Sequence, residues 1–173
     1  HCSLKTAMGL LESYDEEAAL QVVRLEDEVD KYEDELGAYL LKISSRDLSE
    51  KESHEVNIML HSINDFERLA DHALNIKESA EERYTKGMVF SENASAEFAV
   101  FTNAIHEIVD LTVDMFVNGD VTEARKVEPL EEVIDELSVE MKSRHISRLR
   151  MGKCTVELGF ILSDLTTDFE RVA

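Results

Sequence analysis

Paired carboxylates spaced four residues apart recur along this chain, and they are its side chains best suited to chemistry. Two acidic segments each occur twice: Leu25–Asp30 returns 105 residues later as Leu130–Asp135, and Asp65–Ala70 returns 103 residues later as Asp168–Ala173. The carboxylates that share one helical phase in and beside these segments are Glu26, Asp30, Glu67, Asp71, Glu131, Asp135 and Glu170. Each directly follows an apolar residue of a predicted buried stripe, so we expect them to line a groove between two helices of the same unit.

Metal binding is the chemistry that these carboxylates favour. With 38 acidic residues among 173, pairs four apart arise by chance about eight times, so one pair alone carries no information. Their shared phase is informative, because like charges four apart destabilise a helix by roughly 0.2 to 0.5 kcal/mol per pair and a bound cation would offset that loss. Carboxylate oxygens are hard ligands for iron, manganese, magnesium or calcium. An alternative is that nearby basic side chains neutralise the groove, namely Arg24, Lys31, Arg68 and Lys126.

The repeated segments also predict the architecture that positions these side chains. A tandem duplication of a helical unit explains them, and one proline with six glycines suits long helices. We expect an all-α fold, a tandem repeat of two three-helix bundles within a single domain of residues 1–173. Repeat one should cover about residues 1–86 and repeat two about 87–173, and we expect the second repeat to be incomplete at its C-terminal end. The two shifts differ by two residues, which predicts a length difference in the turn between the second and third helices of each unit.

Apolar spacing and helix-end signals predict six helices. They should span residues 3–13, 15–44, 49–84, 92–117, 121–150 and about 151 to the end. Asp15 and Ser49 are expected to cap the second and third helices. Pro129 predicts a kink or a later start in the fifth. An apolar stripe along Val22–Ile43 is expected to be buried over the full length of the second helix.

Composition and charge exclude several functional classes. The net charge is −20, so a nucleic-acid backbone or an anionic membrane face would be repelled. No apolar run approaches the roughly 20 residues needed to cross a bilayer, so we expect no direct membrane insertion. Cys2 and Cys154 fit neither a disulfide framework nor a four-ligand zinc pattern, which favours a reducing interior. No glycine-rich phosphate loop and no nucleophile beside a base is present, so we do not expect an enzyme.

The histidines and the basic residues indicate which kinds of binding site the chain can form. A ferritin-like di-iron centre needs Glu-x-x-His on two helices, and no histidine of this chain has a glutamate three residues before it. Basic residues gather around His145: Lys142, Arg144, Arg148 and Arg150. They predict either an anion site or a solvated helix end, where cations meet the negative end of the helix dipole.

One segment of the chain resembles a known family. Residues Ile63–Ile76, which contain Asp-Phe-Glu-Arg-Leu-Ala-Asp and then Asn-Ile, resemble the signature helix of the PhoU family of phosphate-uptake regulators. The acidic segments at 26–30 and 131–135 look like that family's second helix. The resemblance implies a regulatory role in phosphate uptake and multinuclear iron or zinc clusters held by the paired motifs. It nominates a first site of Glu26, Asp30, Glu67 and Asp71 with Asp65 outside it, and a second of Glu131, Asp135 and Glu170 with Asp168 outside it.

The second unit resembles a narrower subgroup. Residues Arg144–Cys154, followed by Glu157–Phe160 and Asp164, look like the PhoU-like domain that follows the membrane part of bacterial sodium/phosphate cotransporters. This resemblance implies a cytoplasmic domain tethered to the inner face of the cell membrane. Its partner would be the membrane transporter portion of the same chain, or a separate phosphate transporter if the protein is free-standing. Two other functions stay open: a metal-free helical adaptor whose acidic grooves bind basic segments, and a metal-dependent hydrolase. The protein could also form a homodimer.

Overall fold

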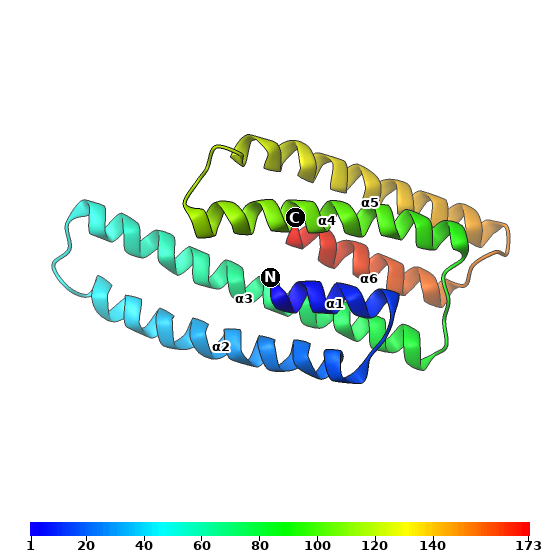
Figure 1. The fold of residues 1–173 in the computed structure, drawn as a ribbon, viewed down its shortest axis with the longest axis horizontal. Coiled ribbons are helices and arrows are strands. Elements are labelled where there is room, and N and C mark those ends of the chain that lie inside the picture. The colour runs from blue at the N-terminus through cyan, green and yellow to red at the C-terminus, as the bar shows by residue number, and fades with distance from the viewer.

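Helices form nearly the whole molecule, as the sequence predicts. The computed structural model describes all residues from His1 to Ala173. The helices are α1 (Cys2–Glu12), α2 (Glu16–Ser44), α3 (Glu50–Thr85), α4 (Glu92–Asn118), the short 3-10 helix η1 (Ala124–Lys126), α5 (Val127–Arg150) and α6 (Val156–Val172). Figure 1 shows them running lengthwise in an elongated body. None has the length and apolar character needed to span a membrane.

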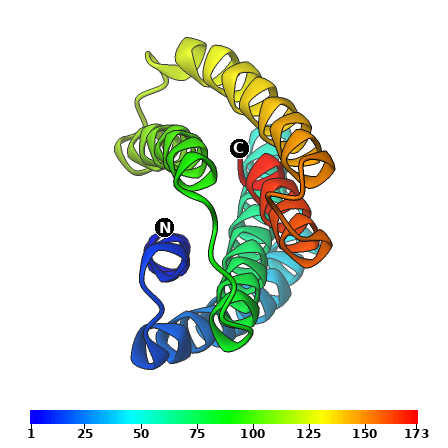
Figure 2. The ribbon, with the colours of Figure 1, turned by 90° about the vertical axis from the view of Figure 1, so that its right-hand side faces the viewer.

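Two three-helix units make up the body. α1 and α2 pack with α3, α4 and α6 pack with α5, and α3 packs on α6 to join the units. Figure 2 shows this joint end on, with α3 beside α6 and with α1 and α4 on one side of them. One core runs through both units, because buried side chains of α1, α3, α4, α5 and α6 belong to a single cluster. At its centre the rings of Phe101 and Phe169 meet edge to face, with centroids 5.6 Å apart.

Local chemistry sets most helix ends where the sequence predicts them. The Asp15 side chain accepts a hydrogen bond from the Ala18 N–H at 2.8 Å, and Ser49 begins α3 with a capping box. Pro129 lies in the first turn of α5, where its missing N–H is not needed. The prediction of a later start there is therefore confirmed.

The start of the last helix differs from the prediction. Gly152 has φ +67°, a left-handed conformation that suits glycine. The N–H of the next residue, Lys153, donates to the Arg148 carbonyl at 2.9 Å. Gly152 therefore ends α5, and α6 begins only after its cap, Thr155.

The predicted length difference between the two inner turns is wrong. Both connections, Ser45–Ser49 and Met151–Thr155, are five residues long. The difference lies in the helices instead, because α3 has a longer run before Asp65 than α6 has before Asp168.

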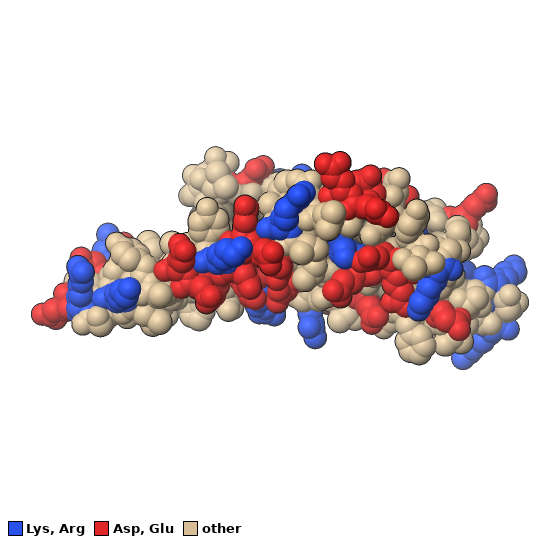
Figure 3. Space-filling model, turned by 90° about the horizontal axis from the view of Figure 1, so that it is seen from below, with Lys and Arg blue, Asp and Glu red and all other residues tan.

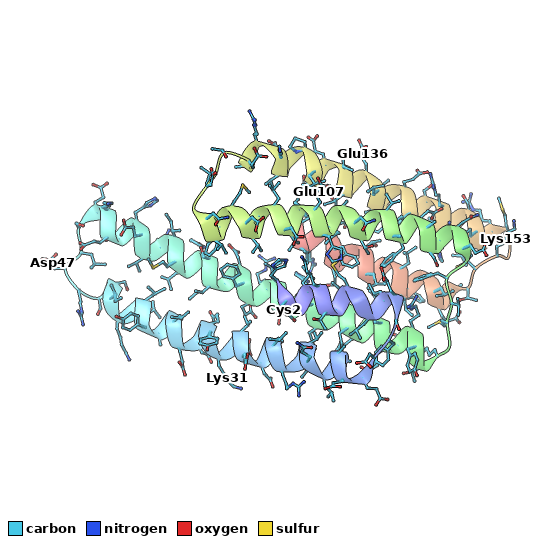
Figure 4. All side chains as sticks on the ribbon, viewed as in Figure 1. Cys2, Lys31, Asp47, Glu107, Glu136 and Lys153 are labelled. Atoms are coloured by element: carbon cyan, nitrogen blue, oxygen red, sulfur yellow. The ribbon has the colours of Figure 1, made fainter.

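The predicted apolar stripe of α2 is not buried along its full length: Leu25, Val29 and Ile43 are half-buried, and the buried residue in the second half of α2 is Leu40, outside the stripe. Val22 is fully buried, but Tyr32, Leu36 and Tyr39 are 64, 44 and 62% exposed. The reason is that α1 is short: it covers the beginning of α2, and the far half of the α2–α3 hairpin extends beyond it (Figure 1). Figure 4 labels Asp47 at the tip of this hairpin, at the opposite end of the body from Lys153.

Candidate functional site

The four predicted ligands of the first unit lie together on α2 and α3. Glu26 and Glu67 are half-buried, and Asp30 and Asp71 are exposed. Burial raises the pKa of the Glu67 carboxyl, and the charges of Asp71 and Asp30 and a hydrogen bond with Asp71 raise it further. Burial likewise raises the pKa of Glu26, with contributions from Asp30 and, from the neighbouring helix, Asp71. The carboxylates of both helices therefore act on one another, and we call these four residues the first acidic cluster.

Basic side chains do not neutralise the first acidic cluster. Arg24, Lys31 and Arg68 form no ion pair, and Lys126 pairs with Glu123. Figure 3 shows Asp and Glu side chains gathered along the underside of the molecule, with only scattered Lys and Arg among them. The negative charge of the cluster is therefore left without an internal counterion.

The first acidic cluster has the donor chemistry of a cation site without a preformed coordination shell. No group of three or more His, Cys, Asp or Glu side chains is arranged to hold one metal ion. Oxygen donors and the raised pKa values of Glu26 and Glu67 nevertheless fit a hard cation, because a bound ion favours the ionised carboxylates.

The predicted ligands of the second unit have a different environment. Glu170 accepts hydrogen bonds from the Ser138 hydroxyl and, at 3.0 Å, from the Lys142 ammonium. Burial alone would raise the pKa of Glu170, but these two hydrogen bonds and the Lys142 charge outweigh it and lower the pKa. Asp135 and Glu170 line one shallow hollow, which does not include Glu131. We call Glu131, Asp135 and Glu170 the second acidic cluster.

Asp168, which the resemblance nominates as an outer ligand, is a buried link between the units. Its carboxylate lies 3.0 Å from His72 Nδ1 and accepts a hydrogen bond from the Asn75 amide at 3.2 Å. Both partners lie on α3, so these contacts join α3 to α6. Asp65, the counterpart in the first unit, is exposed. Sequence reasoning missed this role, and only the buried phase of His72 beside Ala73 hinted at it.

Three of the four basic residues gathered on α5 pair with carboxylates. Arg148 contacts both oxygens of Glu97 on α4, at 2.8 and 2.9 Å, and Arg144 contacts Glu140 at 2.7 Å. Lys142 is the cation that holds Glu170. These pairs leave Arg150, which is exposed in the last turn of α5 and forms no ion pair, as the part of the cluster that fits the predicted solvated helix end.

His145, predicted to join that basic cluster, is buried. Its Nδ1 lies 3.4 Å from the Cys154 sulfur, and burial, followed by the Arg148 charge, lowers its pKa. The ring occupies the space beside Gly159, where an added Cβ would lie 2.6 Å from Nε2. Only a glycine lets α6 pass so close to this ring.

The arrangement of the helices is shared with a protein of known structure. The structure resembles the crystal structure of PhoU from Pseudomonas aeruginosa with a TM-score of 0.87, over 98% of this chain and 81% of that one. At 17% sequence identity this similarity establishes the arrangement of the helices. It agrees with the two three-helix bundles predicted from the repeat.

Sequence comparison establishes the family. The PhoU domain family matches residues 3–80 and 101–173, and the chain belongs to this family. A relative from Thermotoga maritima, the "phosphate-specific transport system accessory protein PhoU homolog 1", is 26% identical over 175 residues, which cover 98% of this chain and 73% of the relative. The resemblance carried by Ile63–Ile76 is thereby confirmed.

Proposed function

We propose that this chain is a non-enzymatic regulatory or accessory domain of phosphate transport. The Thermotoga maritima relative supports this proposal, because its name describes such an accessory protein and its similarity extends over 98% of the chain.

We further propose that the first acidic cluster binds metal cations. The observation that carries this proposal is the raised pKa of Glu26 and Glu67, caused by burial and by neighbouring carboxylates that no basic group compensates. A metal ion or a multinuclear iron or zinc cluster would relieve that repulsion. The second acidic cluster has less support as a metal site, because Lys142 already compensates Glu170.

Metal analysis of protein purified without chelator tests the metal proposal. After exposure to iron, zinc or manganese, the wild type should retain metal and melt at a higher temperature, because a ligand that binds only the folded state stabilises it by about 2.7 kcal/mol at one hundred times its Kd. The E67A/D71A variant should lose both effects. A matched control, E55A/E78A, removes the same charge from α3 outside the cluster and should keep both.

A metal-free adaptor is the second candidate function. The lack of a preformed coordination shell favours it, as does the acidic surface in Figure 3. In this case a lysine- and arginine-rich peptide should bind in the presence of a chelator, and its affinity should fall as salt screens the charges. A wild type that stays metal-free after exposure to all three metals would favour this function over the first.

The partner that we propose is a membrane transporter of phosphate, either the membrane portion of the same chain or a separate protein. The domain would then lie in the cytoplasm, held at the inner face of the membrane. The sequence flanking this chain in its gene tests the first arrangement directly, since it should encode membrane-spanning helices upstream. Co-purification of the tagged domain with a separate transporter tests the second.

A further inference from the structure

A cavity between α1 and α4 lies apart from both acidic clusters. Its volume is about 560 Å³, within the range of small-molecule sites. α1 contributes one helical face, including Lys5 and Gly9, and α4 contributes another, including Thr102 and His106. Phe98 and the segment before α4 complete the lining.

One contact joins α1 to α4 at one end of the cavity, and another joins α1 to α3 near the other end. At the start of α1, His1 Nε2 and Lys5 Nζ lie 2.6 and 2.7 Å from the Asp110 carboxylate of α4. Near the end of α1, Arg83 of α3 donates a hydrogen bond to the Leu11 carbonyl. Figure 2 shows the connection from α3 to α4 running beside α1. The cavity is buried along Phe90 and Phe98 and opens to solvent at Gly9, Glu12 and Val89.

Arg83 is the unusual group in this lining. Its guanidinium is partly withdrawn from water, and burial lowers its pKa. The Cζ atom of Arg83 lies 5.3 Å from the centre of the Phe90 ring. The guanidinium nevertheless forms no ion pair. Acidic residues outnumber basic ones by 38 to 18 in this chain, so an inward-facing arginine without a carboxylate partner is not what composition predicts. A partly buried cation is stabilised by an anion within hydrogen-bond reach.

The apolar part of the lining is aromatic. The Phe90 and Phe98 rings are both buried and stack with centroids 5.9 Å apart. Next to these rings, Lys5 and His106 add nitrogen atoms, and Thr102 adds a hydroxyl group. Glu12 contributes the only carboxylate. The cavity therefore combines an aromatic surface with a cation, a combination that suits a ligand with a flat apolar body and an anionic group.

We propose that this cavity binds a small organic anion, with its anionic group on Arg83 and its apolar body against Phe90 and Phe98. Carboxylates and phosphate monoesters share this chemistry. The site is independent of the acidic clusters and of any metal bound there.

Titration of ¹⁵N-labelled protein with phenyl phosphate, followed by NMR in the presence of a chelator, tests the proposal. Signals of Gly9, Arg83 and Thr102 should shift together and saturate. Benzoate should shift the same signals if any organic anion is accepted, and it should leave them unchanged if the site requires a phosphate monoester. Inorganic phosphate and benzyl alcohol, which each lack half of the ligand, should bind at least roughly tenfold more weakly.

Three variants locate the binding site. R83Q should weaken phenyl phosphate binding roughly tenfold or more, whereas the control K86Q removes a cation from the exposed end of the same helix and should have no effect. G9L should abolish binding without disturbing the fold, because a Cβ at Gly9 meets no atom within 4 Å and only the cavity is filled. E12Q should strengthen binding, because it removes the one carboxylate that repels an anion.

Two results would overturn the proposal. One is equal binding of phenyl phosphate by the wild type and the folded G9L variant. The other is a loss of affinity in E12Q, which would show that the cavity prefers a cationic group.

Discussion

Glu67 and Glu170 occupy equivalent positions in the two repeats, and their surroundings are opposite. Glu67 shares its groove with Asp71 and Asp30, and its pKa is raised. Glu170 accepts hydrogen bonds from Ser138 and Lys142, and its pKa is lowered. Duplication of an acidic motif has therefore not duplicated its electrostatics. One repeat keeps an uncompensated negative charge, and the other supplies its own counterion.

Asp65 and Asp168 differ in the same way. They are equivalent in sequence, but Asp65 faces solvent and Asp168 is buried against His72 at the joint between the units. Only one of the two aspartates lies at the joint, because α3 and α6 contribute different residues to it. Each contrast between the repeats can be tested with a matched pair of variants.

The largest expected difference separates the core of the second unit from the far half of the α2–α3 hairpin. Leu165 is fully buried and Leu36 is 44% exposed. L165A should lower the free energy of unfolding by about 2–5 kcal/mol, because it leaves a cavity in the core. L36A should lower it by less than about 1 kcal/mol. Urea denaturation at pH 7 measures both, and equal losses would show that the far half of the hairpin is covered in solution.

Asp168 and Asp65 should give the next largest difference. D168A leaves His72 and Asn75 without their shared acceptor, so we expect a loss of roughly 2–3 kcal/mol. D65A removes an exposed carboxylate and should change stability by no more than about 0.5 kcal/mol. Thermal unfolding followed by circular dichroism compares the two. Similar melting temperatures would mean that the buried link contributes nothing to stability.

Neutral substitutions of the two equivalent glutamates should act in opposite directions in metal-free protein at pH 7. E170Q weakens the hydrogen bonds from Ser138 and Lys142 and should destabilise by about 1 kcal/mol. E67Q relieves repulsion from Asp71 and Asp30 and should stabilise by about 0.3 kcal/mol. Denaturation in the presence of a chelator measures both. Destabilisation by both variants would contradict the contrast.

E67Q and E170Q should also change the pH dependence of stability in opposite directions. These are the smallest effects that we expect. The pKa of Glu67 is raised in the folded protein, so its favourable contribution is fully present below the unfolded value near 4.5 and is lost as pH rises through the folded pKa. The pKa of Glu170 is lowered, so its contribution is present above the unfolded value and is lost as pH falls through the folded pKa. Differences in melting temperature between the wild type and each variant, measured from about pH 3.5 to 7, should therefore slope in opposite directions.

Local features of the fold could be predicted from the sequence, and contacts between distant helices could not. The caps Asp15 and Ser49 act within one helical turn, so a short segment contains all the information. Periodicity shows which face of α2 is apolar, but it does not show whether a partner helix covers that face, and Tyr39 is exposed for this reason. Gly152 lies between two helices, and it ends α5 although the sequence suggested that it begins α6.

In the candidate site, too, local features could be predicted from the sequence and contacts between distant helices could not. The first acidic cluster could be predicted because the phase of Glu26 and Glu67 along two adjacent helices places them in one groove. The pairing of Lys142 with Glu170 depends on the rotation of α5 against α6, which the spacing does not determine. The contact of His72 with Asp168 depends on how one repeat docks on the other.

The joint between α3 and α6 has a consequence for the order in which the molecule is built. His72 and Asp168 are 96 residues apart in the chain, whereas α2 and α3 are joined by a connection of five residues. During synthesis, α3 is complete before any of the second unit exists. At about 5–20 residues per second, the face of α3 that binds α6 waits roughly 5–20 s for its partner. The first repeat must therefore stay soluble with this face open until the ribosome has nearly finished the second.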